Sequence, residues 1–116
     1  MIVKLYRMKK LEINIPLYDR KVTVLYADDL KTIDDYIRDT YRENFGPYRE
    51  DRGACSYVLS NNDIFIAISK DLHDRYLVHE TGHVTFSLME IIGINPVADE
   101  ESFCYIQDYI FDKINV

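Results

Sequence analysis

A chain of 116 residues has the length of one domain, and 47% hydrophobic residues, with 13% aromatic, are enough for one core. This composition excludes a wholly disordered chain, and the length excludes two catalytic domains, so we expect a single domain over residues 1–116. The formal charge of −6 repels a phosphate backbone, and nucleic-acid binding is therefore not expected.

The N-terminus and the cysteines bear on the cellular compartment. Residues 1–10 lack the apolar stretch of a secretion signal, and no later run reaches membrane-spanning length. We therefore expect an intracellular protein without membrane contact. Cys55 and Cys104 are too few for a disulfide framework, and neither has a second Cys or His at ligand spacing. Both are expected to be small core residues.

Four runs rich in β-branched and aromatic residues predict strands that pair as two hairpins. These runs are residues 11–15 and 22–26, joined by 16–21, and residues 54–60 and 63–69, joined by Asn61 and Asn62. Pro16 has no N–H to donate in a ladder, so the first strand should end there or lie at an edge of the sheet. The Asn pair favours a tight turn.

Three segments with apolar residues at helical spacing predict helices. They run from about 29 to 43, from 71 to about 92, and from about 98 to 114. Asp28 and Asp29 supply N-cap chemistry for the first, Gly93 is a C-cap for the second, and Asp99 lies at the start of the third. A polar loop over 46–53 precedes the second hairpin. This order of elements predicts an α+β fold with a small, mostly antiparallel sheet packed on helices.

Residues 79–83 read His-Glu-Thr-Gly-His, an HExxH motif on the expected second helix. Four residues at about 100° each return His83 to within about 40° of His79, so both imidazoles can hold one metal ion. Glu80 lies beside them and can act as general base on a water that zinc makes acidic. The alternatives are that the two histidines are hydrogen-bonded structural residues, or that they bind a metal that catalyses no reaction.

Tetrahedral zinc needs a third protein ligand and keeps its fourth position for water. The third helix begins with Asp99, Glu100 and Glu101, and a turn over 93–96 can bring its start beside the motif helix. An acidic first turn is also ordinary chemistry that opposes the helix dipole. We prefer Glu101 as the ligand, because it shares a helix face with Tyr105, and keep Glu100 as the alternative.

No residue is identified as the stabiliser of a tetrahedral oxyanion. Tyr105, Tyr109 and His73 are candidates, and Tyr105 is the one we select. Their ordinary roles are tyrosines at the rim of the core and a solvated histidine near a helix start. Gly82 costs about 1 kcal/mol inside a helix relative to Ala, which close approach of a strand or of the last helix would explain.

These features resemble the gluzincins, zinc metallopeptidases in which an HExxH helix is followed by a glutamate ligand on a later helix. The chain is similar to compact metallopeptidase-like proteins encoded by bacteriophages. The segments that carry the resemblance are residues 13–17, 22–24, 65–68, 79–83 and 99–106. It implies a zincin-like fold with zinc held by His79, His83 and Glu101. It also implies Glu80 as the base, and the strand at about 63–69 bordering the cleft as an edge strand that pairs with a peptide.

The leading hypothesis is therefore a zinc-dependent peptidase that cuts a peptide or protein, in the host cytoplasm if a phage encodes it. The chain lacks a second lobe that would close over a substrate. The alternative is an inactive zincin-fold binding or assembly protein, such as a virion component, that keeps the metal. A third hypothesis is a structural zinc site that joins the last two helices.

Overall fold

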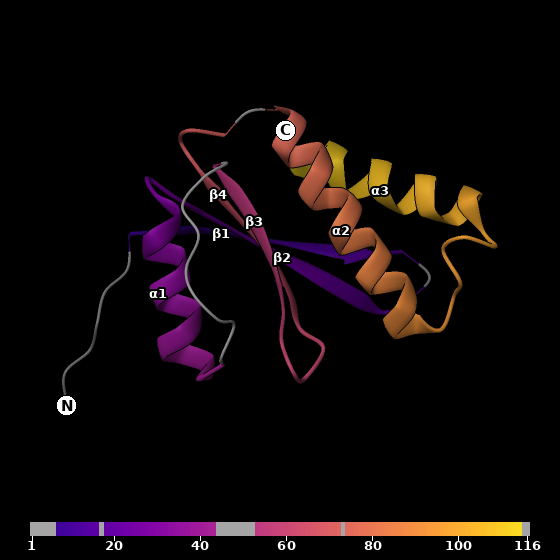
Figure 1. Cartoon of the computed structure of the whole chain (residues 1–116), viewed down its shortest axis with the longest axis horizontal. Coiled ribbons are helices and arrows are strands. Elements are labelled where there is room, and N and C mark those ends of the chain that lie inside the picture. Colours follow the sequence, from indigo (N-terminus) through magenta and orange to yellow (C-terminus); the bar gives the residue numbers. More distant parts are fainter. Residues whose placement is uncertain (1–6, 17, 44–52, 73, 115–116) are drawn as a thin grey trace.

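One mixed four-stranded sheet, in the order β1-β2-β4-β3, forms the centre of the molecule (Figure 1). The strands are β1 (Lys9–Ile15), β2 (Arg20–Ala27), β3 (Ala54–Val58) and β4 (Ile64–Ser69). The computed structural model describes residues 7–16, 18–43, 53–72 and 74–114. β1 pairs with β2 and β3 pairs with β4 in antiparallel fashion, which confirms the two predicted hairpins. β2 and β4 are parallel neighbours, and this pairing makes the sheet mixed.

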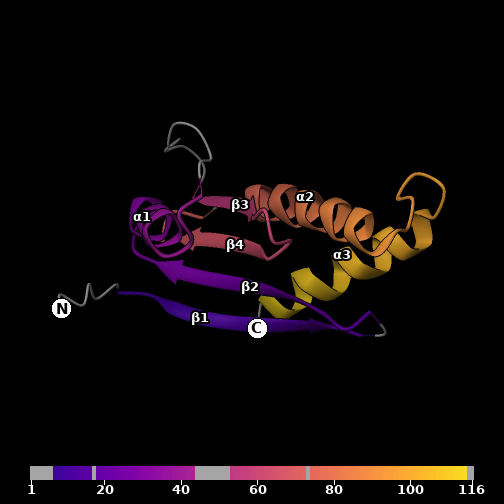
Figure 2. The same cartoon turned by 90° about the horizontal axis from the view of Figure 1, so that it is seen from below.

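Three helices cover the two faces of this sheet. They are α1 (Leu30–Tyr41), α2 (Asp74–Ile92) and α3 (Glu100–Ile114). α1 packs on one face, whereas α2 and α3 share the other, and α3 lies between α2 and β1 (Figure 2). None of these helices, within the described part of the chain, has the length and apolar character needed to cross a membrane. Three helices packed on one four-stranded sheet confirm the predicted α+β class.

Side-chain caps set the helix ends close to where the sequence predicts them. The Asp29 carboxylate accepts a hydrogen bond from the Thr32 N–H at 2.8 Å and caps α1. Asp99 caps α3 in the same way, accepting from the Ser102 N–H at 3.0 Å. Gly93 ends α2 with a φ of 84°, a left-handed conformation that suits a residue without a Cβ. Local chemistry therefore sets at least one end of each helix.

β4 is the best-buried of the described strands, since all six of its residues are buried. Ile64, Ile66 and Ile68 point toward α2 and α3, while Phe65 and Ala67 point toward α1. The alternation follows from the two-residue repeat of a strand, and burial on both faces follows from its central place. β4 therefore links the two halves of the core.

The prediction that the strand at 63–69 is an edge strand was wrong. β4 lies between β2 and β3, so the edges of the sheet are β1 and β3. Its uninterrupted apolar run is typical of a strand buried on both faces, whereas edge strands usually carry polar residues. The prediction for Pro16 is confirmed, because β1 ends at Ile15 and is an edge strand.

Smaller predictions fared unevenly. The β3–β4 turn is one residue longer than the Asn pair: the Leu59 N–H bonds to the Asp63 carbonyl at 2.9 Å, and Asn62 adopts a φ of 71°. Cys55 is half-buried, but Cys104 is exposed and is not a core residue. The predicted polar loop, apart from Gly53, and His73 lie outside the described residues.

Candidate active site on the HExxH helix

The motif residues 79–83 lie in the first half of α2, and both histidines point to its exposed side. The Nε2 atoms of His79 and His83 are 3.0 Å apart, and the two rings meet edge to face. Two nitrogens that bind one tetrahedral zinc at about 2.0–2.1 Å lie about 3.3 Å from each other. The 3.0 Å separation is that of a ring-to-ring hydrogen bond and is also close to the spacing of two ligand nitrogens on one zinc ion.

Glu80 is turned away from the histidines and toward the sheet. Its side chain is 8% exposed, and Oε2 accepts a hydrogen bond from the Ser56 hydroxyl of β3 at 2.8 Å. The described residues supply no second hydrogen bond to this carboxylate. A buried carboxylate needs several partners to offset the loss of water. Glu80 is thus held by one oxygen, while the other has no hydrogen-bond donor among the described residues.

β3 holds Ser56 in place because its next residue is anchored on the opposite face of the sheet. The buried Tyr57 hydroxyl donates to Oδ1 of Asp34 in α1 at 2.9 Å. Burial, with the neighbouring Cys55 and Asp34, raises the pKa of Tyr57, so the phenol stays protonated and remains a donor. The strand that contacts Glu80 is therefore pinned from both sides.

The last helix approaches the motif at Gly82. A Cβ on Gly82 would lie 3.4 Å from Nε2 of Gln107 in α3, and the same Gln107 amide donates to the Val78 carbonyl at 3.5 Å. The predicted close approach is confirmed. Gln107 is therefore the residue of α3 level with the motif, and Glu101 lies six residues earlier, about 9 Å along the helix axis.

The structure does not bring Glu101 to the histidine pair. Glu100 and Glu101 are both exposed in the first turn of α3. Over the described residues, no group of three or more His, Cys, Asp or Glu side chains forms a metal cluster. The structure thus joins His79 with His83 and sets Glu80 beside them, and the third-ligand assignment stays a prediction.

The tyrosine candidates for an oxyanion stabiliser differ in exposure. Tyr105 is 60% exposed on α3. Tyr109 is half-buried, packs against the core and has the Lys113 ammonium 5.3 Å from its ring centre, as expected of a rim tyrosine. Thr81 and Thr85 are buried, and their hydroxyls bond to carbonyls of α2 itself, so they serve the helix backbone.

Sequence reasoning missed the contact of Ser56 with the motif. Ser56 lies 24 positions before Glu80, and no local pattern links the two residues. A polar residue in the middle of a predicted strand was the only available signal.

No protein-family model, curated protein or solved structure gives a significant match to this chain.

Proposed function

We propose that this protein is a zinc-dependent peptidase of gluzincin type, encoded by a phage, with its site on the 79–83 turn of α2. His79 and His83 hold the metal, Glu101 is the third ligand and Glu80 is the general base. One observation carries the proposal: a single helix turn presents two imidazole nitrogens 3.0 Å apart to solvent and directs the carboxylate of Glu80, between them in sequence, against the edge strand β3.

The arrangement of Glu80 suits a proton carrier in peptide hydrolysis. A zinc ion bound at this site supplies Lewis-acid chemistry, which makes water acidic near neutral pH and polarises a carbonyl. Glu80 takes the proton of the attacking water and passes it to the leaving amine. The Ser56 hydroxyl fixes one carboxylate oxygen at 2.8 Å, so the other is held in one orientation for this transfer.

The free edge of β3 supports a peptide as the substrate. Among the described residues, β3 pairs with β4 alone, so its other side offers backbone N–H and C=O groups that no described strand uses. An extended peptide can add to such an edge as a further strand. Because Ser56 of β3 touches Glu80, a peptide on this edge would pass beside the base.

The third ligand is placed in the first turn of α3. Glu101 and the alternative Glu100 are exposed and form no ion pair with any described residue, so either carboxylate is free to bind a cation. Zinc affinities of Glu101→Gln and Glu100→Gln, measured by calorimetry, decide between them. The true ligand should lose at least about 10-fold in affinity, which corresponds to about 1.4 kcal/mol.

A second candidate is a zincin-fold binding or virion assembly protein without turnover. The observation that favours it is that the two histidines gather no third ligating side chain among the described residues. Such a protein would bind zinc weakly through His79 and His83. It would also cut no substrate, with or without the metal.

Zinc stoichiometry and cleavage of a fluorogenic peptide library separate these functions. Wild type should bind one zinc and cut; His83→Ala should lose both properties. Glu80→Gln should keep zinc and lose about 10²- to 10⁴-fold in cleavage rate, the usual contribution of a general base. Glu90→Gln, an exposed carboxylate on the same helix, is the matched control and should change neither. Zinc binding without cleavage by wild type would favour the second candidate, and no zinc binding would exclude the peptidase.

A further inference from the structure

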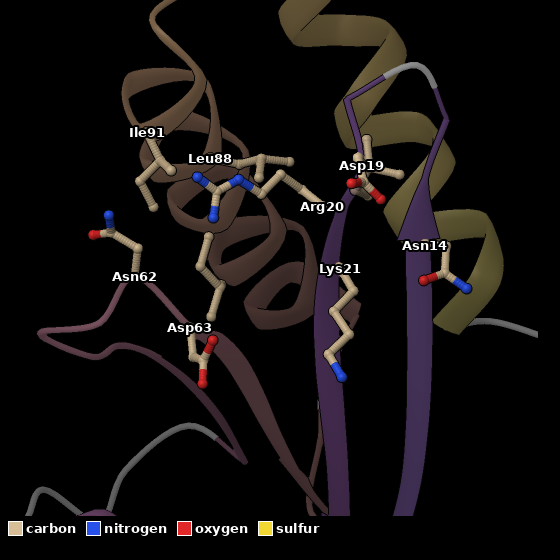
Figure 3. Close-up of a pocket in the computed structure, with 10 residues that line it drawn as sticks. Asn14, Asp19, Arg20, Lys21, Asn62, Asp63, Leu88 and Ile91 are labelled. Atoms are coloured by element: carbon tan, nitrogen blue, oxygen red, sulfur yellow. The ribbon is translucent and has the colours of Figure 1, made fainter.

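The two ends of β2 carry different pockets. Figure 3 shows the one at the start of β2, beside the C-terminal half of α2 and the β3–β4 turn. Most of its aliphatic lining is buried, and Leu88 fully so. Its two cations, Arg20 and Lys21, are offset by the carboxylates of Asp19 and Asp63. This end of the strand therefore offers a ligand little exposed apolar surface and no excess of charge.

A second pocket, of about 540 Å³, opens beyond the other end of β2. Its lining comes from residues 26–28 at the end of β2, residues 69 and 70 at the end of β4, and residues 7–9 at the start of β1. The volume lies in the range of pockets that hold small ligands. Because β2 and β4 are parallel neighbours, the pocket lies outside the carboxyl ends of both strands.

The chain leaves these two strands toward opposite faces of the sheet. β2 leads into α1, whereas β4 leads into α2, and Figure 1 shows these two helices on opposite sides of the strands. Neighbouring parallel strands with such diverging connections form a topological switch point, and the crevice outside their carboxyl ends is where open α/β sheets bind ligands. The strand topology therefore favours this end of β2 as a place for a ligand.

Three half-buried side chains give this pocket exposed apolar surface. Met8 and Ala27 pack with the core on the α1 face, whereas Tyr26 packs with the core on the α2 face. The pocket therefore extends around the end of β2 from one face to the other. Lys9 lies directly opposite Tyr26 in the antiparallel register, so its side chain leaves the sheet on the same side as the phenol ring. This juxtaposition suits a ligand with a flat or apolar body and an anionic end.

Cations outnumber carboxylates around this pocket. Arg7, Lys9 and Lys70 line it and are exposed, and none of them forms a salt bridge with a described residue. Among the described lining residues, only Asp28 is acidic. The neighbouring Asp29 caps α1, and hydrogen bonds from the first turn of that helix, with a smaller effect of the Lys70 charge, hold its pKa below the usual value. The excess of positive charge favours an anionic ligand.

We propose that this pocket binds a small phosphate monoester with a flat or apolar body. The guanidinium of Arg7 pairs with two phosphate oxygens, and the ammonium groups of Lys9 and Lys70 add charge. The body of the ligand packs on Tyr26 and Met8. A phosphate monoester carries close to two negative charges at pH 7, so it gains more from three cations than a carboxylate does. Binding of this kind requires neither zinc nor peptide cleavage and is independent of the proposed peptidase function.

Titration of the full chain with small anions, followed by ¹⁵N NMR, tests this site. The probes are phenyl phosphate, inorganic phosphate and benzoate at constant ionic strength, without added metal, so that zinc at the histidine pair captures no phosphate. Phenyl phosphate should bind at least about 5-fold more tightly than either of the others, and should shift the amide signals of Met8, Ala27 and Lys70. Absence of binding, equal affinity for the three probes, or shifts confined to other parts of the chain would overturn the proposal.

Neutralising single cations localises the binding. Arg7→Gln and Lys70→Gln should each weaken phenyl phosphate binding by at least about 10-fold, the loss expected when an anion loses one charge-assisted hydrogen bond. Arg20→Gln makes the same charge change at the start of β2 and should leave the affinity unchanged. All three positions are exposed, so the variants should keep the wild-type fold, which thermal unfolding checks. Equal weakening by the three variants would mean that net charge attracts the anion, and would exclude the pocket.

Truncation of the apolar lining tests the preference for a flat or apolar body. Tyr26→Ala should lower the affinity for phenyl phosphate toward that for inorganic phosphate, and should leave inorganic phosphate binding unchanged. Because Tyr26 also packs on the core, Met8→Ala at the other side of the pocket is the second variant, with the same direction of change. A phenyl phosphate preference that survives both substitutions would overturn the role of the apolar lining.

Discussion

Two buried carboxylates, Asp34 and Glu80, lie on opposite faces of the sheet and are contacted by adjacent residues of β3. Tyr57 donates to Asp34 on the α1 face, and Ser56 donates to Glu80 on the α2 face. Asp34 is 3% exposed, and its second oxygen accepts from the Arg38 guanidinium at 2.7 Å. Glu80 has no such cation among the described residues. Both carboxylates are buried and both contact β3, but Asp34 has hydrogen-bond partners on both oxygens and Glu80 has a described partner on one.

In the proposed function, this difference separates a structural carboxylate, Asp34, from the proposed general base, Glu80. Both oxygens of Asp34 are engaged, so the group is neutralised by its neighbours and fixes α1 to β3. One oxygen of Glu80 is held by Ser56 and the other has no described donor, next to an exposed histidine pair. A carboxylate with both oxygens hydrogen-bonded has no oxygen without a partner for a substrate, whereas a carboxylate with one bonded oxygen still has one.

The comparison predicts opposite stability effects for the two carboxylates. Asp34→Ala should lower the free energy of unfolding by about 3 kcal/mol, because it leaves the Tyr57 hydroxyl and Arg38 without their partner. Glu80→Gln should change it by less than about 1 kcal/mol, since the amide oxygen still accepts from Ser56. Urea denaturation of both variants measures these values. Equal losses would mean that Glu80 is a structural group like Asp34.

Tyr57→Phe removes only the hydroxyl that donates to Asp34 on the α1 face of the sheet. It should cost about 2 kcal/mol, the value of a buried hydrogen bond to a charged group. Burial raises the pKa of Tyr57, so the folded protein keeps this proton above about pH 10, where an unfolded tyrosine loses it. The stability from Tyr57 is therefore complete below about pH 10 and falls as pH rises further.

The pH dependence of unfolding checks the role of Tyr57. Wild type should lose stability between about pH 10 and 12, and Tyr57→Phe should lose less over the same range. Burial also raises the pKa of Tyr26 and Tyr41, so part of the alkaline loss should remain in the variant. Identical pH profiles would show that the Tyr57 phenol does not report folding in this range.

Ser56→Ala removes the matching donor on the α2 face of the sheet. Because Glu80 lies at the border of the buried side of α2, we expect a loss of only about 1 kcal/mol in stability. Loss of orientation should lower kcat by about 10-fold with KM little changed, and Ser56→Thr should restore part of it. Zinc affinity should not change. A fall in stability as large as that of Asp34→Ala would contradict a positioning role.

Gly82→Ala should have the smallest effect, and in the opposite direction. Its new Cβ would meet the end of the flexible Gln107 side chain at 3.4 Å, which can move aside. The better helix propensity of Ala should then raise stability by up to about 1 kcal/mol. Thermal unfolding measures the change, with Gly93→Ala as a contrast, since the φ of 84° at Gly93 makes a side chain strained there. Destabilisation at both positions would mean that α3 cannot yield at Gly82.

Much of the local structure followed from local signals. The caps at Asp29 and Asp99 and the terminator at Gly93 act on backbone groups within a turn of themselves. The HExxH spacing placed both imidazoles on one side of α2 because helix geometry repeats every 3.6 residues. These predictions needed no knowledge of the rest of the chain.

Other features depended on contacts between distant segments. The sequence predicted two hairpins, but their union through parallel β2 and β4 made β3 the edge strand instead of β4. The Ser56–Glu80 contact then follows from α2 packing on one face of that strand. The register of α3 on α2 placed Gln107 beside the motif, and Glu101 about 9 Å further along.

The sequence by itself therefore determined the elements, their ends and the histidine pair, since each is a matter of neighbouring residues and backbone periodicity. Only the tertiary structure decided which strand is exposed, which hydroxyl holds Glu80 and where the first turn of α3 lies. Strand order and helix register are set by packing over the whole core, and many local patterns are compatible with more than one such packing.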